Sequence, residues 1–185
     1  MSDRHTVRAD WHDYNGGIYF VTICSHDKKH IFGAIKNGGI AYSSLGGIVN
    51  RCLSAIPDHH NDVELLNYVV MPNHIHMVLA VGAQYFAPDT PAPSVTSSIG
   101  CLKPPRHGEP CVDNHFNSRL AVIVRSFKAA CSIEINRHRR AQNIAPLLVW
   151  QRNYHEHIIR NRRAYENIMA YIDSNVANWA TDRFN

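Results

Sequence analysis

The residues of this chain that could do chemistry begin with His74 and His76, which are separated by one isoleucine. They follow Pro72 within the stretch 68–79, where apolar residues predict strands near 63–71 and 74–81. Successive side chains of a strand point to opposite faces, so both imidazoles are expected on one face. Two neighbouring imidazoles on a rigid sheet form a divalent-metal site that lacks only a third donor.

A tyrosine on the last predicted helix is the second chemical candidate. Asn161 is a good N-cap, and apolar residues at helical spacing predict a helix from there to about Trp179. Tyr171 lies off that apolar stripe among amide and hydroxyl side chains, and Asn175 follows it by one turn on the same side. A core tyrosine would share the stripe of the isoleucines, so Tyr171 is a candidate for chemistry.

Together these side chains predict phosphoryl transfer on a nucleic acid. His74, His76 and the amide oxygen of Asn175 would hold Mg²⁺ or Mn²⁺ and leave open positions for phosphate oxygens. The metal would polarise a phosphodiester, and Tyr171 would attack phosphorus while a 3′-hydroxyl leaves. The resulting phosphotyrosine keeps the bond energy, so another DNA end can be joined. The reaction needs single-stranded or frayed DNA, for which basic helices offer a groove.

The distribution of charge also favours a polyanionic partner. Residues 119–163 include ten basic and two acidic side chains, a net charge of +8, whereas the whole chain carries only +4. Such an imbalance is typical of a nucleic-acid-binding surface. The residues that we predict to contact DNA are Arg125, Lys128, His157 and Arg160. His155 and His157 repeat the spacing of the first pair and could hold a second metal, but we expect His157 to orient DNA or a neighbour of the catalytic site.

Composition predicts one cytoplasmic domain. The 185 residues are 45% hydrophobic and 18% charged, values that suit a globular protein. We expect neither a membrane span nor a signal peptide, because no apolar run is long enough and the N-terminus is polar. Five cysteines without a C-x-x-C motif argue against a disulfide framework or a cysteine zinc site and indicate a reducing cytoplasm.

The order of predicted elements indicates an α+β fold. Strands are expected at 17–24, as a hairpin within 31–42 around Asn37-Gly38, in the two central segments and at 149–159. Helices are expected at 44–56, capped by Ser44 and ended by Pro57, then from 117 and from 161. This order predicts a ferredoxin-like antiparallel sheet with helices packed on one face. Residues 82–116 hold six of the nine prolines and are predicted to be a flexible insertion in this single domain of residues 1–185.

The motifs resemble those of a known family. The run Met71-Pro72-Asn73-His74-Ile75-His76 resembles the signature of HUH transposases with a single catalytic tyrosine. Trp150-Gln151, the run from Tyr154 to Arg160, and Tyr171-Ile172 with Asn175 are similar to the REP-associated subgroup. The resemblance covers nearly the whole chain except the insertion. It implies a ferredoxin-like domain that cleaves and joins single-stranded DNA at hairpins formed by imperfect palindromes, with Tyr171 as the nucleophile.

The chain departs from the family pattern near the third metal ligand. Insertion-sequence members have a glutamine four residues after the tyrosine, where this chain has Asn175 with a shorter arm. REP-associated members commonly have Asn-Pro where this chain has Asn175-Val176, a difference expected to affect helix termination more than chemistry. Insertion-sequence relatives form dimers that exchange tyrosine helices, whereas REP-associated ones work as monomers, so a homodimer and a monomer both stay open.

Two other functions fit the same residues. The chain could be a domesticated, non-catalytic protein that binds DNA hairpins with the same scaffold. It could also be a metallohydrolase that uses water instead of a tyrosine. Tyr154 is the rival candidate for the nucleophile. Packing with Trp150 and Ile158 on the same predicted strand is, however, an adequate reason for a tyrosine at this position.

Overall fold

The computed structural model describes residues 12, 14–82, 118–182 and 184. Within these residues the strands are β1 (Gly17–Cys24), β2 (Gly33–Lys36), β3 (Gly39–Tyr42), β4 (Val63–Val70), β5 (His74–Val81) and β6 (His155–Ile159). The α-helices are α1 (Ser44–Ser54), α2 (Ile56–His59), α3 (Arg119–Ala141) and α4 (Arg162–Ser174), and the 3₁₀ turns are η1 (His26–Lys28) and η4 (Trp179–Thr181).

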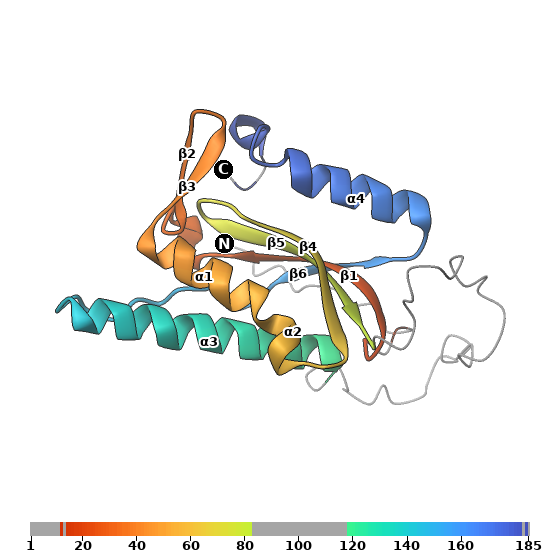
Figure 1. Ribbon diagram of the computed structural model, residues 1–185, viewed down its shortest axis with the longest axis horizontal. Coiled ribbons are helices and arrows are strands. Elements are labelled where there is room, and N and C mark those ends of the chain that lie inside the picture. Colours follow the sequence, from red (N-terminus) through yellow and green to blue (C-terminus); the bar gives the residue numbers. More distant parts are fainter. Residues whose placement is uncertain (1–11, 13, 83–117, 183, 185) are drawn as a thin grey trace, which may run out of the picture.

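Four of these strands form one antiparallel sheet in the order β4-β5-β1-β6, beside the separate β2–β3 hairpin (Figure 1). Along the chain, helix α1 lies between β1 and β4, and helix α3 lies between β5 and β6. This strand order and these two helical connections are the ferredoxin-like arrangement. Asn37 and Gly38 turn the hairpin with φ of 52° and 74°, the left-handed conformation that a two-residue turn needs. The predicted α+β class, the antiparallel sheet and the hairpin are confirmed.

The helices cover both faces of the sheet. On one face, Tyr19, Val21 and Ile23 of β1 are fully buried in a core shared with α1 and α3. Helix α4 lies on the other face (Figure 1), where its Ile172 packs in a smaller core with Val78 of β5. The prediction that helices pack on one face therefore holds for α1 and α3 but not for α4. An apolar stripe indicates that a helix packs against the sheet, whereas the connection that follows β6 determines which face of the sheet α4 covers.

Polar side chains set where the helices begin. Ser43 Oγ accepts from the backbone N–H of Gly46 at 3.0 Å, so the cap of α1 lies one residue before the predicted Ser44. Helix α1 ends at Ser54, and Pro57 lies in the first turn of α2, where its missing N–H costs nothing. Asn161 caps α4 as predicted, with Oδ1 2.9 Å from the N–H of Ala164.

Two predicted elements are shorter in the structure than in the sequence pattern. The strand expected at 149–159 is interrupted: Trp150 forms an isolated antiparallel bridge with Ser25, and β6 begins only at His155. Between them, Lys128 Nζ donates to the carbonyls of Gln151 and Arg152 at 2.6 and 3.0 Å. Helix α4 ends at Ser174, five residues before the predicted end at Trp179, and the chain then turns back toward the sheet.

The predicted insertion at 82–116 lies outside the described residues except for Gly82. The N–H of Gly82 donates to the carbonyl of Asp62 at 2.7 Å, directly after the end of β5. Within the described part of the chain, none of the helices is both long enough and apolar enough to cross a membrane.

Candidate functional site

The histidine pair lies at the start of β5, directly after a tight turn from β4. The N–H of Met71 donates to the carbonyl of His74 at 2.8 Å and closes this turn around Pro72. His74 and His76 point to the face that carries α4, and their exposed fractions are 0% and 1%. The predicted pair is thus placed side by side, held by a strand that is buried along its whole length.

Hydrogen bonds orient both imidazole rings. Asn73 donates from Nδ2 to the carbonyl of Phe184 at 2.7 Å, so its Oδ1, which can only accept, faces His74 Nδ1 at 2.8 Å. His74 therefore carries its proton on Nδ1 and presents a lone pair on Nε2. The Nδ1 atom of His76 lies 2.8 Å from the hydroxyl of Thr22, which can accept or donate. The two Nε2 atoms face each other at 3.0 Å.

Burial keeps His74 in the form that binds metals. The pKa of His74 is lowered to about 4, mainly because the ring is desolvated by burial; the charge of Asp182 opposes this shift and that of Lys28 adds to it. The ring is therefore neutral at neutral pH, and neutral imidazole is the form that binds a metal ion.

Asp182 adds a carboxylate to the pair from the segment after α4. Its Oδ2 lies 3.9 Å from His74 Nε2, and the ligand atoms of His74, His76 and Asp182 all lie within 4.8 Å of one another. Asp182 was not among the residues predicted from the sequence, because Asp182 follows the predicted helix and no spacing rule connects it to β5. The turn that ends α4 early brings it back to the sheet.

Two aromatic rings of the same segment close over the histidines. Trp179 stacks near His74 with ring centroids 6.0 Å apart and an interplanar angle of 27°. Phe184 lies 4.8 Å from the His74 ring and 5.8 Å from the His76 ring. These rings exclude water from one side of the pair, which strengthens electrostatic interactions there.

Tyr171 lies beside the histidine pair and is the first residue of the last turn of α4. Its Oη is 3.4 Å from His76 Nε2, and its side chain is 40% exposed. The ring meets Phe20 of β1 edge-on, with centroids 6.0 Å apart and planes at 89°. The predicted nucleophile thus lies beside the two predicted metal ligands.

Asn175 is buried at the C-terminal end of α4, with an exposed fraction of 2%. Its Oδ1 is shielded from solvent and accepts no hydrogen bond in the described structure. A buried carbonyl oxygen without a partner is costly, so most such atoms have one. The predicted third ligand is thus a buried amide oxygen without a hydrogen-bond partner in the described structure.

These donors fit a divalent cation. Two neighbouring ligands of a six-coordinate ion, each about 2.1 Å away at right angles, are about 3.0 Å apart. The two Nε2 atoms have this separation. Imidazole nitrogen and carboxylate oxygen are both common ligands of divalent metal ions in proteins. The group of His74, His76 and Asp182 can therefore bind a metal.

The predicted DNA contacts divide between the two faces of the sheet. Arg125 and Lys128 lie on α3, whose buried residues pack on the face opposite Tyr171. Lys128 connects α3 to the segment before β6 by its two bonds to backbone carbonyls, and its burial lowers its pKa. The structure does not bring these two residues to the histidine pair.

His157 and Arg160 lie nearer the site, at the edge strand β6. Both side chains are exposed, and His157 pairs in register with Phe20 of β1. Tyr154, the rival nucleophile, instead packs against the core shared with α1 and α3. Tyr154 and Tyr171 are therefore separated by the sheet.

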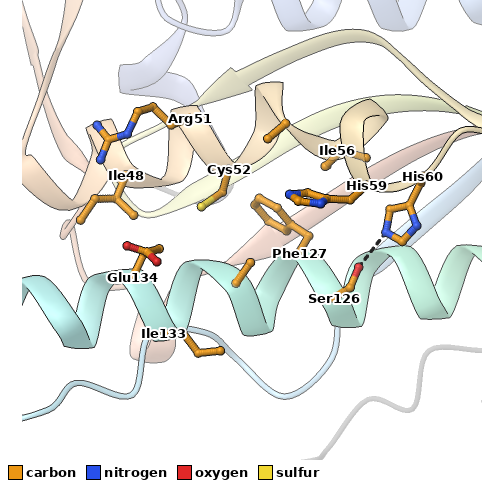
Figure 2. A pocket seen from close by; sticks show the side chains of 12 residues that line it. Ile48, Arg51, Cys52, Ile56, His59, His60, Ser126, Phe127, Ile133 and Glu134 are labelled. Carbon is orange, nitrogen blue, oxygen red and sulfur yellow. Dashed lines mark hydrogen bonds between the residues drawn. The ribbon is translucent and has the colours of Figure 1, made fainter.

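A groove of about 620 Å³ between α1, α2 and α3 contains a second pairing of reactive residue types (Figure 2). His60 Nε2 lies 2.9 Å from Ser126 Oγ there. Arg119, which can only donate, lies 3.2 Å from His60 Nδ1, so the proton of His60 is on Nε2. The hydroxyl of Ser126 donates to the carbonyl of Ile123 at 2.9 Å. His60 thus donates to the serine, and the pair is not arranged as a base and a nucleophile.

The contribution of Asp182 to metal binding can be measured directly. We expect Asp182→Asn to weaken Mn²⁺ binding at least tenfold, because outer partners of a metal site alone cost about 10-fold to 100-fold when removed. Isothermal titration calorimetry measures this change, with Asp58→Asn on α2 as the control. The same titration of Asn175→Ala shows how much the amide contributes. Unchanged affinity of Asp182→Asn would show that the carboxylate is not a ligand.

Comparisons with known proteins give one sequence relative and structural neighbours. No protein-family model matches the chain. An uncharacterised protein of Haemophilus influenzae is 30% identical over 181 residues, which are 97% of this chain and 92% of the relative. A candidate transposase from Deinococcus radiodurans is 13% identical over 94% of this chain and 97% of that chain, with a TM-score of 0.45. That structural similarity is too low to bear on the fold.

A REP-associated tyrosine transposase, solved in complex with a REP hairpin, is the more informative structural neighbour. It is 15% identical to this chain, with a TM-score of 0.53 over 99% of this chain and 77% of that chain. At 15% identity, this similarity shows the fold alone. The chain therefore belongs to the same protein family as the Haemophilus influenzae relative, and it shares its fold with the REP-associated tyrosine transposase.

Proposed function

We propose that this protein is a transposase that cleaves and rejoins single-stranded DNA at hairpin-forming sequences, with Mg²⁺ or Mn²⁺ as its cofactor. The observation that carries the proposal is the position of Tyr171, whose Oη lies 3.4 Å from His76 Nε2. An accessible phenol beside a buried group of metal-binding side chains is suited to nucleophilic attack on phosphorus.

The proposed reaction is an exchange of phosphate esters on Tyr171. A divalent ion bound by His74, His76 and Asp182 would polarise the phosphodiester as a Lewis acid. Tyr171 releases its phenolic proton to solvent, and its oxygen bonds to phosphorus as the bond to the 3′ oxygen breaks. The 3′ oxygen takes up a proton and leaves as a hydroxyl, and the 5′ phosphate stays on the tyrosine. Because an ester replaces an ester, a 3′-hydroxyl can reverse the step and join the DNA.

Fold and charge support a DNA hairpin as the substrate. The REP-associated transposase with this fold was solved bound to a REP hairpin. In the present chain, Arg160 follows β6 and Arg163 lies in the first turn of α4, so these exposed charges can neutralise phosphates on the face that carries Tyr171.

The geometry also supports a site that works within one chain. Tyr171 and His76 of the same molecule lie together, although they are 95 residues apart in the sequence. Because the nucleophile and the metal-binding group come from one chain, a monomer can carry out the proposed reaction without exchange of α4.

A covalent-adduct assay tests the proposal. The wild-type protein is mixed with Mn²⁺ or a chelator and a labelled library of imperfect-palindrome hairpins with single-stranded flanks. We expect an adduct that survives denaturation, requires the metal and is lost in Tyr171→Phe. Tyr154→Phe is the matched control, because its ring lies on the other face of the sheet and its loss should leave the adduct intact.

The other outcomes separate the remaining functions. Tight hairpin binding without any adduct would favour the non-catalytic binding protein. DNA cleavage that persists in Tyr171→Phe would favour a metallohydrolase that uses water. An adduct lost only in Tyr154→Phe would overturn the assignment of the nucleophile but keep the reaction.

A further inference from the structure

The face of the sheet that carries Tyr171 continues past the histidine pair to the edge strand β6. The register places Thr22 of β1 between His76 of β5 and His155 of β6 in one row. In the next row, Phe20 of β1 lies opposite His157 of β6. Paired residues of neighbouring strands point to the same side, so His155 and His157 share the face of His76.

The side chains at this edge form a partly open aromatic surface. His155 and His157 are exposed, and Phe20 is half-buried between them and the site. The Phe20 ring is 5.1 Å from the His76 ring and 6.0 Å from the Tyr171 ring. His155 in turn lies 6.3 Å from the Phe184 ring that covers the histidines. We call Phe20, His155 and His157 the β6 platform.

We propose that the β6 platform stacks the base next to the phosphate that Tyr171 attacks. This inference rests on the proposed function, since it specifies how the DNA strand is positioned at that site. Neighbouring strands are about 4.8 Å apart, so His157 lies one strand beyond Phe20, which itself contacts Tyr171. A strand whose phosphate reaches Tyr171 therefore has its adjoining base over these rings.

The chemistry of the platform favours a nucleobase over other ligands. Flat rings of phenylalanine and histidine stack on any base, which is how single-stranded nucleic acids are held without reading their sequence. A second metal at His155 and His157 is not supported, because in the described residues the metal-binding group consists of His74, His76 and Asp182. Arg160, exposed directly after β6, adds a positive charge for the backbone.

The test uses Tyr171→Phe as the parent, so that binding is measured without chemistry. Hairpins carry 2-aminopurine or an abasic site at each position of the single-stranded flanks in turn. Variants are His157→Ala, His157→Phe and, as control, the exposed His59→Ala on α2. Fluorescence anisotropy at fixed salt gives affinity, and 2-aminopurine fluorescence reports stacking on a ring.

We expect quenching of 2-aminopurine at one flank position, lost in His157→Ala and kept in His157→Phe. Affinity for the intact hairpin should fall about tenfold in His157→Ala, within the usual contribution of one stacked base. On the hairpin that is abasic at that position, the same variant should show no further loss. In His59→Ala affinity and quenching should match those of the parent.

The outcomes distinguish this inference from the proposed function. His157→Ala and the abasic site could reduce DNA affinity by independent factors at every flank position. The proposed stacking of a base on His157 would then be wrong, even when the wild-type protein forms an adduct. Ring-dependent quenching without an adduct would support the platform and contradict the phosphotyrosine reaction. Absence of DNA binding would overturn both.

Discussion

Mn²⁺ should stabilise the wild-type protein against heat, and His76→Ala should abolish this stabilisation. A ligand at 100 times its dissociation constant stabilises the folded state by about 2.7 kcal/mol. For a chain of this size, that corresponds to a rise in Tm of about 5–10 °C. The physical reason is that His76 Nε2, 3.0 Å from His74 Nε2, is one of two nitrogens that the metal needs at once. Differential scanning fluorimetry with and without Mn²⁺ measures the shift.

The same substitution should remove catalysis by a larger factor. Lewis-acid stabilisation of the transition state is worth several kcal/mol, so the rate of adduct formation should fall by at least about 10³-fold. His59→Ala is the matched control, because it removes an exposed imidazole from α2 on the other face. Circular dichroism checks that the sheet is retained. A metal-dependent Tm shift that survives in His76→Ala would show that the ion binds elsewhere.

The second large effect concerns the stability of the scaffold, at Gly46 in the first turn of α1. A methyl group added there would overlap the carbonyl oxygen of Phe32 and lie 2.8 Å from its carbonyl carbon. That carbonyl also accepts from the N–H of Ser43 at 3.0 Å, so it cannot move away without breaking the start of the helix. Overpacking of this kind typically costs about 1–3 kcal/mol or more. We expect Gly46→Ala to lower Tm by about 5–10 °C.

The neighbouring glycine provides the control for this prediction. A methyl group at Gly47 would meet only the guanidinium of Arg51, at 3.9 Å. Gly47→Ala should therefore raise stability by up to about 1 kcal/mol, because alanine is the better helix former. Chemical denaturation of the two variants gives free energies of unfolding with opposite signs of change. Equal effects would contradict the close approach of α1 to Phe32.

The sequence by itself determined the parts of the site that depend on local periodicity. The two-residue period of a strand is enough to place His74 and His76 on one face. The helical period is enough to separate exposed Tyr171 from buried Ile172. The order of strands and helices was likewise enough for the ferredoxin-like sheet, since connections between consecutive elements follow few topologies.

Only the tertiary structure decided which distant groups meet. The face on which α4 packs, and hence the contact between Tyr171 and His76, depends on where the chain turns after β6. Asp182 joins the histidines only because α4 ends early and the segment after it folds back. Lys128, a predicted DNA contact, lies on α3 and donates to two backbone carbonyls of the segment before β6, a contact that the sequence does not predict. Such contacts are set by long-range packing, for which a residue's neighbours in the sequence carry no periodic signal.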